Sequence, residues 1–333
     1  MRRFTTAFVA ALATVGLVTT ACGGAGSDGA SPAASTVTIT QVNGVTEFPV
    51  GPTRIVATGY SIDNLLALGI KPVAVVEGGL PLPAPWHGKQ LDGIPIITSP
   101  DKKSMPVEEI AKYRPELFAG DNYVVDRPTF ERLSAVTKVL GGIEENGSSA
   151  AWDVQLKALG RILDKEDAVS RVLAEDEARF AAVRERHPGL RGKSAVLAQY
   201  LAAASSFNFV SSAADPTNTM FAELGMTLPM AIKDNPRFAT GSGQQGGRTP
   251  VSLELLPQIA SNLMVIYPNG ATAADLQRLP GYAGLPQVTS GATKVVDLQT
   301  VIALNQPTPL SREWILPQLE PLFVNVAQQQ AVA

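Results

Sequence analysis

Short apolar runs alternate with helical segments along most of the chain. Residues 54–59 form a β-branched run, and a helix over 61–68 follows it and stops at Gly69. Further strands are expected at 72–76, 94–98, 117–119 and 136–140. Helices are expected between them at 107–113 and 128–134. Strands that alternate with helices indicate βα units and a largely parallel sheet.

The pattern changes in the middle of the chain. From Trp152 to Arg186 apolar positions recur at helical spacing, with a mild interruption near Asp164. Alternation then resumes, with apolar segments at 194–199, 220–224, 254–259, 263–266 and 294–298 and a closing helix from Ser311. This order predicts an α/β fold of two Rossmann-like lobes joined by one long helix. The expected bounds are an N-terminal lobe over 36–150, the interlobe helix over 151–188 and a C-terminal lobe over 189–330.

The first residues are typical of a secretory leader. Arg2 and Arg3 precede an apolar stretch over 8–18, which is the length of a leader's apolar region and too short for a membrane span. No second stretch of this kind follows, so we expect a mature protein that does not cross the membrane. Residues 1–21 are therefore predicted to be a signal peptide.

The leader ends in a segment that resembles a bacterial lipobox. Cys22 follows the small residue Ala21, although Thr19 stands where Leu or Val is usual. In a lipobox the cysteine carries the lipid and becomes the new N-terminus. We therefore expect a protein that is exported and anchored through Cys22 to the outer face of the cell membrane, which is the periplasmic side if an outer membrane exists. Residues 22–35, rich in Gly, Ser and Ala, would form a flexible tether. The alternative is that Cys22 is an ordinary residue of the leader.

Composition excludes two classes of function. The net charge is −3, and the 27 Lys and Arg are scattered without a basic run, so we expect no nucleic-acid partner. Two histidines and one cysteine cannot supply the three or four ligands that a bare transition metal needs. A metal cargo would have to arrive already chelated, and we expect neither a resident metal site nor a cofactor.

Four of the six tyrosines fall near the expected ends of strands, two in each half of the chain. They are Tyr60, Tyr123 (next to Asn122), Tyr200 and Tyr267. Ligands bind beyond the carboxyl ends of strands in open parallel sheets, so two facing lobes would place these rings around a cleft. Such rings suit a bulky, partly polar organic ligand. The alternative is that each tyrosine has one packed side and one wet side, as is common at strand ends.

Five segments together resemble the iron-siderophore and cobalamin family of periplasmic substrate-binding proteins. They are RIVA at 54–57, DNLLALGIKPV at 63–73, VEEIAKYRPEL at 107–117, VSLELLP at 251–257 and LSREWIL at 310–316. The similarity runs from about residue 54 to residue 326. It implies the class III fold of two lobes with a backbone helix, and a monomer that captures a chelate outside the cytoplasm. It also implies delivery to an ABC permease and its ATPase.

The resemblance also assigns two docking residues. In this family one glutamate on each lobe pairs with arginines of the permease, and the matching positions are Glu108 and Glu254. Exposed carboxylates of this kind steer docking more than they add affinity. The alternative is that both are solvated glutamates favoured by the dipole of a first helical turn.

The ligand residues of this family vary, so the candidates come from position and chemistry. They are Tyr60, Trp86, Asn122, Tyr123, Tyr200, Phe207, Arg237, Arg248, Tyr267 and Asn305. Arg248 stands in a Gly-rich stretch, where a guanidinium could reach the oxygens of a chelate. Trp86 could equally pack one lobe against the other. Since few arginines are available for a triply anionic catecholate complex, a ferric siderophore of the hydroxamate type is the favoured cargo.

Other interpretations stay open at this point. Cobalamin or haem would fit the same fold, and haem would need an axial ligand such as Tyr60. An exported lipoprotein enzyme of the α/β hydrolase kind would need an imidazole, which only His87 and His187 offer. Residues 241–246 match Gly-x-Gly-x-x-Gly, but no clean strand precedes them and no helix follows. We therefore interpret that segment as a mobile loop at the mouth of the cleft and expect a binding protein without catalytic activity.

Overall fold

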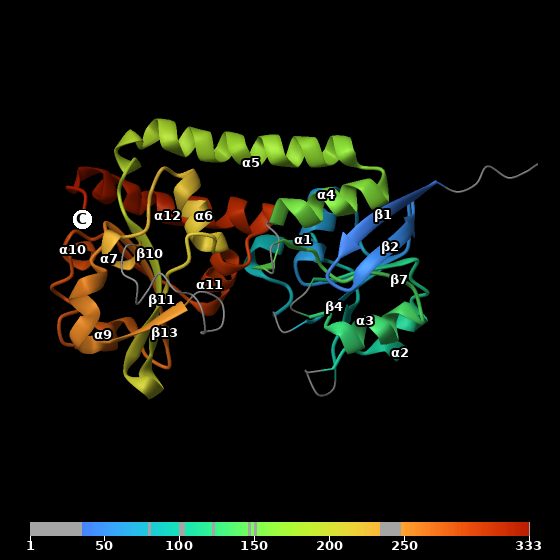
Figure 1. The fold of residues 1–333 in the computed structure, drawn as a ribbon, viewed down its shortest axis with the longest axis horizontal. Helices are drawn as coiled ribbons and strands as arrows, with labels where there is room; N and C mark the ends of the chain where they lie inside the picture. The colour runs from blue at the N-terminus through green and yellow to red at the C-terminus, as the bar shows by residue number, and fades with distance from the viewer. Residues whose placement is uncertain are drawn as a thin grey trace, which may run out of the picture. The chain divides into compact units, whose positions relative to one another are not determined.

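The structure is a computed structural model that describes residues 35–78, 81–99, 104–121, 124–145, 148–149, 152–233 and 248–332. It contains two five-stranded sheets, one from each half of the chain (Figure 1). A two-stranded hairpin of β1 (Thr36–Gln41) and β2 (Gly44–Pro49) precedes the first sheet. No helix in these ranges has the length and apolar character that a membrane span requires.

The first sheet is parallel throughout and has the order β5-β4-β3-β6-β7. Its strands are β3 (Ile55–Thr58), β4 (Ala74–Val76), β5 (Ile96–Ile97), β6 (Leu117–Ala119) and β7 (Lys138–Leu140). Its helices are α1 (Tyr60–Ala67), α2 (Val107–Lys112) and α3 (Arg127–Ser134), with a 3-10 turn η1 (Pro85–His87). All residues of β3, β4 and β6 are buried, which is why their sequences are continuous apolar runs. The parallel sheet predicted for this half is confirmed.

The second sheet is mixed and has the order β12-β11-β10-β13-β14. Its strands are β10 (Ala195–Leu201), β11 (Ser206–Val210), β12 (Arg248–Ser252), β13 (Leu263–Asn269) and β14 (Thr293–Val295). β10, β13 and β14 are parallel, whereas β11 and β12 are antiparallel additions at one edge. The sequence did not predict these two strands. The chain turns back after β10 through the 3-10 turn η3 (Ala202–Ala204) and the left-handed Ser205, without the glycine that usually marks such a turn.

Helical segments surround the second sheet. They are η2 (Pro188–Leu190), α6 (Pro216–Glu223), α7 (Met230–Lys233), η4 (Leu253–Ile259), α9 (Ala273–Gln277), α10 (Pro286–Thr289), α11 (Leu298–Asn305) and α12 (Pro309–Gln328). The closing helix predicted from Ser311 is confirmed, and it begins two residues earlier because Thr308 caps it: the Thr308 hydroxyl accepts from the Ser311 amide at 3.1 Å.

The single helix predicted over 151–188 is wrong in one respect, because the segment forms two helices. α4 (Trp152–Leu163) and α5 (Glu166–Arg186) are separated at Asp164, whose φ of 55° is left-handed. The apolar pattern indicates an interruption near Asp164, but the structure shows a complete break there rather than a mild one. α4 packs in the core of the first lobe through Leu156, Leu159 and Ile162. The element that joins the lobes is therefore α5 alone.

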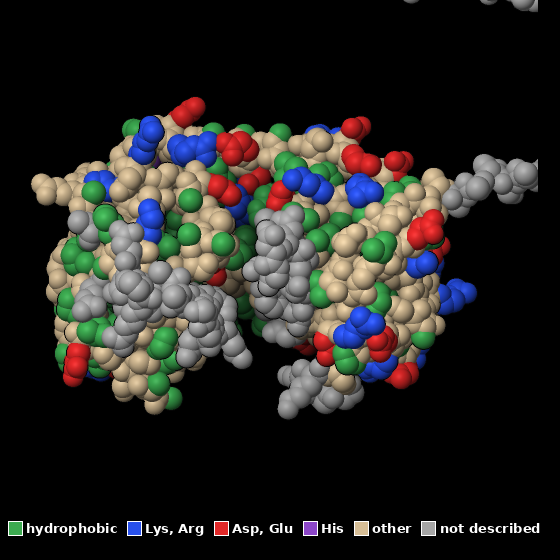
Figure 2. All heavy atoms as spheres, viewed as in Figure 1, with side chains coloured by type: hydrophobic (Ala, Val, Ile, Leu, Met, Phe, Trp, Pro, Cys, Tyr) green, Lys and Arg blue, Asp and Glu red, His purple; other side chains and the backbone are tan. Residues whose placement is uncertain are grey.

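α5 contributes to the cores of both lobes. Its first turns place Val169 and Val172 in the first core, and its later turns place Phe180 and Val183 in the second. Its solvent side carries charges of both signs, intermingled along the helix (Figure 2). One rigid helix thus belongs to two hydrophobic cores and fixes the distance between them.

A buried arginine ties α5 to its neighbours. Arg312 of α12 is 2% exposed, and its Nε and Nη2 donate to both carboxylate oxygens of Asp176 on α5 at 2.6–3.1 Å. Glu223 at the end of α6 accepts a further hydrogen bond from Nη2. The guanidinium carbon lies 4.2 Å from the centroid of the Phe180 ring and 5.1 Å from that of Trp152. Burial acts to lower the pKa of Arg312, but the hydrogen bonds and charges of Asp176 and Glu223 outweigh it, so the pKa is raised.

Removing this guanidinium should destabilise the protein strongly. Arg312→Ala leaves the buried Asp176 carboxylate with only the more distant Arg179, whose Nη2 lies 3.7 Å from Oδ1. We expect it to lower the free energy of unfolding by about 3–5 kcal/mol. Urea denaturation followed by circular dichroism measures the change. The matched control is Arg278→Ala, which breaks the exposed ion pair with Asp275 and should leave the unfolding midpoint unchanged. An Arg312 variant as stable as the control would show that the buried pair contributes little.

Candidate functional site

The site begins where the order of the first sheet reverses. β3 and β6 lie side by side there, and their carboxyl ends lead to Gly59 and to Asp121. The Tyr60 amide donates to Asp121 Oδ2 at 3.0 Å, which places a carboxylate at the start of α1. Gly59 has a φ of 57°, and a Cβ at this position would lie 1.7 Å from Asp121 Oδ2. Only glycine therefore allows the chain to turn this closely past Asp121.

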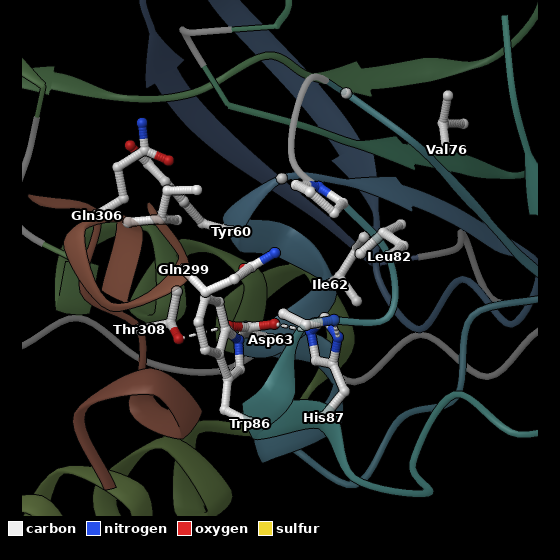
Figure 3. A pocket seen from close by; sticks show the side chains of 15 residues that line it. Tyr60, Ile62, Asp63, Val76, Leu82, Trp86, His87, Gln299, Gln306 and Thr308 are labelled. Atoms are coloured by element: carbon white, nitrogen blue, oxygen red, sulfur yellow. Dashed lines mark hydrogen bonds and ion pairs between the residues drawn. The ribbon is translucent and has the colours of Figure 1, made fainter. Parts of the chain in front are cut away.

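A cleft opens at this edge and is lined by both lobes. It holds about 420 Å³ of space free of protein atoms, part of it open to solvent. The first lobe contributes residues that follow β3 and β4 together with η1, and the second contributes Gln299, Ile302, Gln306 and Thr308 (Figure 3). Most of the lining from the first lobe is apolar, as at Ile62, Val76 and Leu82. This is the position at which open parallel sheets bind ligands.

The Asp63 carboxylate lies at the centre of a hydrogen-bonded group between the lobes. Asp63 is on α1 and is 4% exposed. Its Oδ1 accepts from His87 Nε2 at 2.6 Å, and its Oδ2 accepts from Trp86 Nε1 at 2.7 Å and from the Thr308 hydroxyl. Figure 3 shows Trp86, His87 and Thr308 directed at this carboxylate from two sides. Thr308 caps α12, so the group joins α1 and η1 of the first lobe to the second lobe.

The hydrogen bonds of His87 define its tautomer. Its Nδ1 accepts from the Ala84 amide at 2.8 Å, so Nδ1 carries no proton. Its proton is then on Nε2, which donates to Asp63. All three donors to the carboxylate are therefore uncharged, and no Lys or Arg is found among the described residues that line the cleft.

Trp86 makes a second contact between the lobes. Its ring centroid lies 5.6 Å from that of Trp314 on α12, at an interplanar angle of 55°. The ring also lines the cleft. Trp86 therefore packs on Trp314, borders the cleft and donates a hydrogen bond from Nε1 to Asp63. Trp86 thus packs between the lobes and also lines the cleft, while its contact with a ligand stays a prediction.

Of the predicted ligand residues, Tyr60 and Trp86 line the cleft. Asn305 precedes the lining residue Gln306, and its Oδ1 accepts from Thr217 at 3.2 Å. Asn122, Tyr123 and Arg237, the Gly-rich segment at 241–246 and the lipidation site Cys22 lie outside the described residues.

The expectation that Tyr200 and Tyr267 lie just past strand ends is wrong. β10 and β13 pair in register up to Leu201 and Asn269, so both tyrosines lie inside longer strands than the apolar runs indicated. Tyr200 is 6% exposed and packs on the buried Phe207 ring at 5.0 Å. Tyr267 is half-buried against the core of the second lobe. Neither they nor Phe207 line the cleft described here.

Arg248 is the first residue of β12, rather than part of a loop, and is half-buried. It lies near Asp215, the residue that caps α6. Burial raises the pKa of Asp215, while the Thr217 hydrogen bonds and the positive charge of Arg248 act in the opposite direction. Part of the charge of Arg248 is therefore balanced within the protein.

Glu108 and Glu254 lie one on each lobe and are both exposed. Glu108 is in the first turn of α2, and Glu254 is in the first turn of the 3-10 helix η4. These positions suit both the docking role and the solvated alternative.

Four polar residues of the site were not singled out from the sequence: Asp63, Gln299, Gln306 and Thr308. Asp63 carried a signal, since it is a charged residue between Ile62 and Leu65 on the buried side of a short helix. The others come from a segment that only long-range packing brings to the first lobe. Among the described residues, no group of three or more His, Cys, Asp or Glu side chains could hold a metal ion.

A model of the family described as "Periplasmic binding protein" matches residues 55–299, well over half of the chain. The chain belongs to the periplasmic binding protein family. This periplasmic binding protein has the two-lobed class III fold, and members of the family bind substrates for transport and are not enzymes. The enzyme alternative is thereby set aside.

The sequence is also similar to that of one curated protein. It is the "Probable siderophore-binding lipoprotein YfiY" of Bacillus subtilis (strain 168), which is 26% identical over 201 residues. The match covers 59% of this periplasmic binding protein and 60% of the relative, so the chain spans less than two thirds of its length.

Solved structures with the same fold include a periplasmic solute binding protein from Mycobacterium smegmatis and Streptococcus pneumoniae PiaA in complex with ferrichrome. The first has a TM-score of 0.70 at 21% identity and covers 88% of this chain and 99% of its own. The second has a TM-score of 0.69 at 20% identity and covers 87% and 98%.

Asp63→Ala tests the group at the lobe boundary. The variant leaves the buried His87 and Thr308 and the half-buried Trp86 without their acceptor, and we expect the free energy of unfolding to fall by about 3 kcal/mol. Urea denaturation measures this, and the indole proton resonance of Trp86 should shift upfield as its hydrogen bond is lost. Asp153→Ala is the control because it removes only an i,i+4 pair with Lys157, worth less than about 0.5 kcal/mol. An unchanged Trp86 resonance would contradict the geometry.

Proposed function

We propose that this periplasmic binding protein captures a ferric siderophore of the hydroxamate type in the cleft between its lobes. The observation that carries the proposal is the lining itself, which is apolar and aromatic with a few polar groups, among them the Asp63 carboxylate, and, in its described part, no Lys or Arg. A ferric tris-catecholate is a trianion and would lose its hydration without a cation to replace it. A ferric hydroxamate such as ferrichrome has no such charge to compensate.

The similar proteins support this cargo. YfiY is described as siderophore-binding, and the PiaA structure contains ferrichrome. The iron would arrive inside the chelate, so the protein needs no metal ligands of its own. Rings such as Tyr60 and Trp86 offer flat faces and hydrogen-bonding groups to the organic part of the complex.

The loaded protein would deliver its cargo to an ABC permease driven by an ATPase. Glu108 and Glu254, exposed on separate lobes, would contact arginines of the permease and orient the complex. The protein would act as a monomer on the outside of the cell membrane, held by a lipid on Cys22 after removal of residues 1–21. The lipoprotein name of YfiY supports the anchor.

Tryptophan quenching tests the cargo. Ferrichrome should quench the fluorescence with a Kd below about 1 µM, because its binding energy must exceed about 8 kcal/mol to compete for scarce iron. A ferric tris-catecholate, haem and cobalamin are titrated in parallel. Among single Trp→Phe variants, Trp86→Phe should show the largest loss of quenching by ferrichrome. Tight binding of haem or cobalamin with no response to ferrichrome would replace this proposal by the alternative cargo.

Charge reversal tests docking. Glu108→Lys with Glu254→Lys should reduce uptake of radioactive iron supplied as ferrichrome by at least about tenfold, since like charges would meet at the permease. Chelate binding by the purified variant should be unchanged. Glu131→Lys, at an exposed position on α3, is the matched control. Normal uptake by the double variant would favour the solvated alternative for both glutamates.

A further inference from the structure

α11 presents amide side chains to the cleft. Gln299 and Ile302 lie on one side of the helix, and Gln306 follows its last residue; all three line the cleft (Figure 3). The opposite side of α11 is held in the core of the second lobe by Val301 and Leu304. The helix is also capped, because Asp297 accepts from the Thr300 amide at 2.9 Å. The two glutamines are therefore carried by a fixed element.

The side-chain amides of Gln299 and Gln306 make no hydrogen bond within the part of the chain that the structure describes. Both residues are half-buried. Each amide offers one acceptor oxygen and two donor protons. The other polar groups that converge here are already used: the Asp63 carboxylate takes the protons of Trp86, His87 and Thr308.

Among the described residues, the charge of the cleft lining is of one sign only, negative. Asp63 is a carboxylate whose three donors are all uncharged, and the lining within the described residues contains no cation to balance it. Electrostatic interactions are strong in a partly dehydrated cleft. Every chelate that enters the cleft loses water, but only an anion is also repelled by the negative charge of Asp63.

We propose that Gln299 and Gln306 are specificity-determining residues that bind the uncharged oxygens and amides of the chelate, while Asp63 excludes chelates with a net negative charge. The inference rests on the proposed function and adds to it the residues that select the ligand and the sign of its charge. Neutral ferrichrome and cationic ferrioxamine B are then accepted, and a ferric tris-catecholate is rejected.

The experiment compares these three chelates by tryptophan quenching at low and high salt. The unmodified protein should bind ferrichrome and ferrioxamine B at least about 100-fold more tightly than the tris-catecholate. Gln299→Ala and Gln306→Ala should each weaken ferrichrome about 5- to 10-fold, as expected for the loss of one or two hydrogen bonds. Gln299→Lys and Gln306→Lys should strengthen the tris-catecholate at least about tenfold, and high salt should reduce that gain.

Gln277→Ala and Gln277→Lys are the controls, since Gln277 is exposed on α9 and does not line the cleft. Melting curves of all variants should match that of the unmodified protein, because none of these glutamine side chains is bonded in the fold. If ferrichrome binds tightly but the glutamine variants change no affinity by more than twofold, this inference is wrong and the proposed function stands. Equal affinity of the unmodified protein for all three chelates would also overturn it. If no ferric chelate binds at all, the proposed function itself is wrong.

Discussion

The guanidinium of Arg312 holds together elements that come from distant parts of the chain. It reaches Asp176 on α5 and Glu223 on α6, and it lies over Phe180 and near Trp152. An arginine in this environment requires both carboxylates, because its burial would otherwise be very costly. The carboxylate of Asp176 in turn requires the arginine. This mutual requirement fixes α12 against the helix that belongs to both hydrophobic cores.

The position of α12 determines the second half of the cleft. Because α12 is held at Arg312, its first turn brings Thr308 to Asp63 and Trp314 to Trp86. α11 precedes this turn and places Gln299 and Gln306 opposite the residues that follow β3 and β4. The cleft is thus a product of the packing of α11 and α12 as much as of the strand ends themselves. A rigid α5 leaves little room for a large hinge motion and favours small adjustments of the lobes.

Local patterns in the sequence predicted the first lobe well. β3 is a β-branched run that ends at Gly59, and this position requires glycine for a steric reason visible in the structure. Features that depend on distant contacts were missed. β11 pairs with β10, and β12 pairs with β11. The alternation of Phe207 and Phe209 with polar residues is a strand signal, but it spans only five residues and was missed. The apolar pattern indicates a mild interruption near Asp164, but it does not show that a left-handed residue there separates α4 from α5. The positions of Tyr60 and Trp86 at the cleft could be predicted from the sequence, whereas the position of Tyr200 inside a strand depends on the register of β10 and β13.

Thr308 serves two neighbours at once. Its hydroxyl accepts from the Ser311 amide and donates to Asp63. The same oxygen therefore caps the N-terminus of α12 in one lobe and supplies a hydrogen bond to a carboxylate in the other. Separation of the lobes at this point would remove the Thr308 hydroxyl from the buried Asp63 carboxylate, unless the start of α12 unwinds and moves together with α1. Any widening of the cleft at this point would therefore have to break the hydrogen bond between Thr308 and Asp63 or disturb the cap of α12.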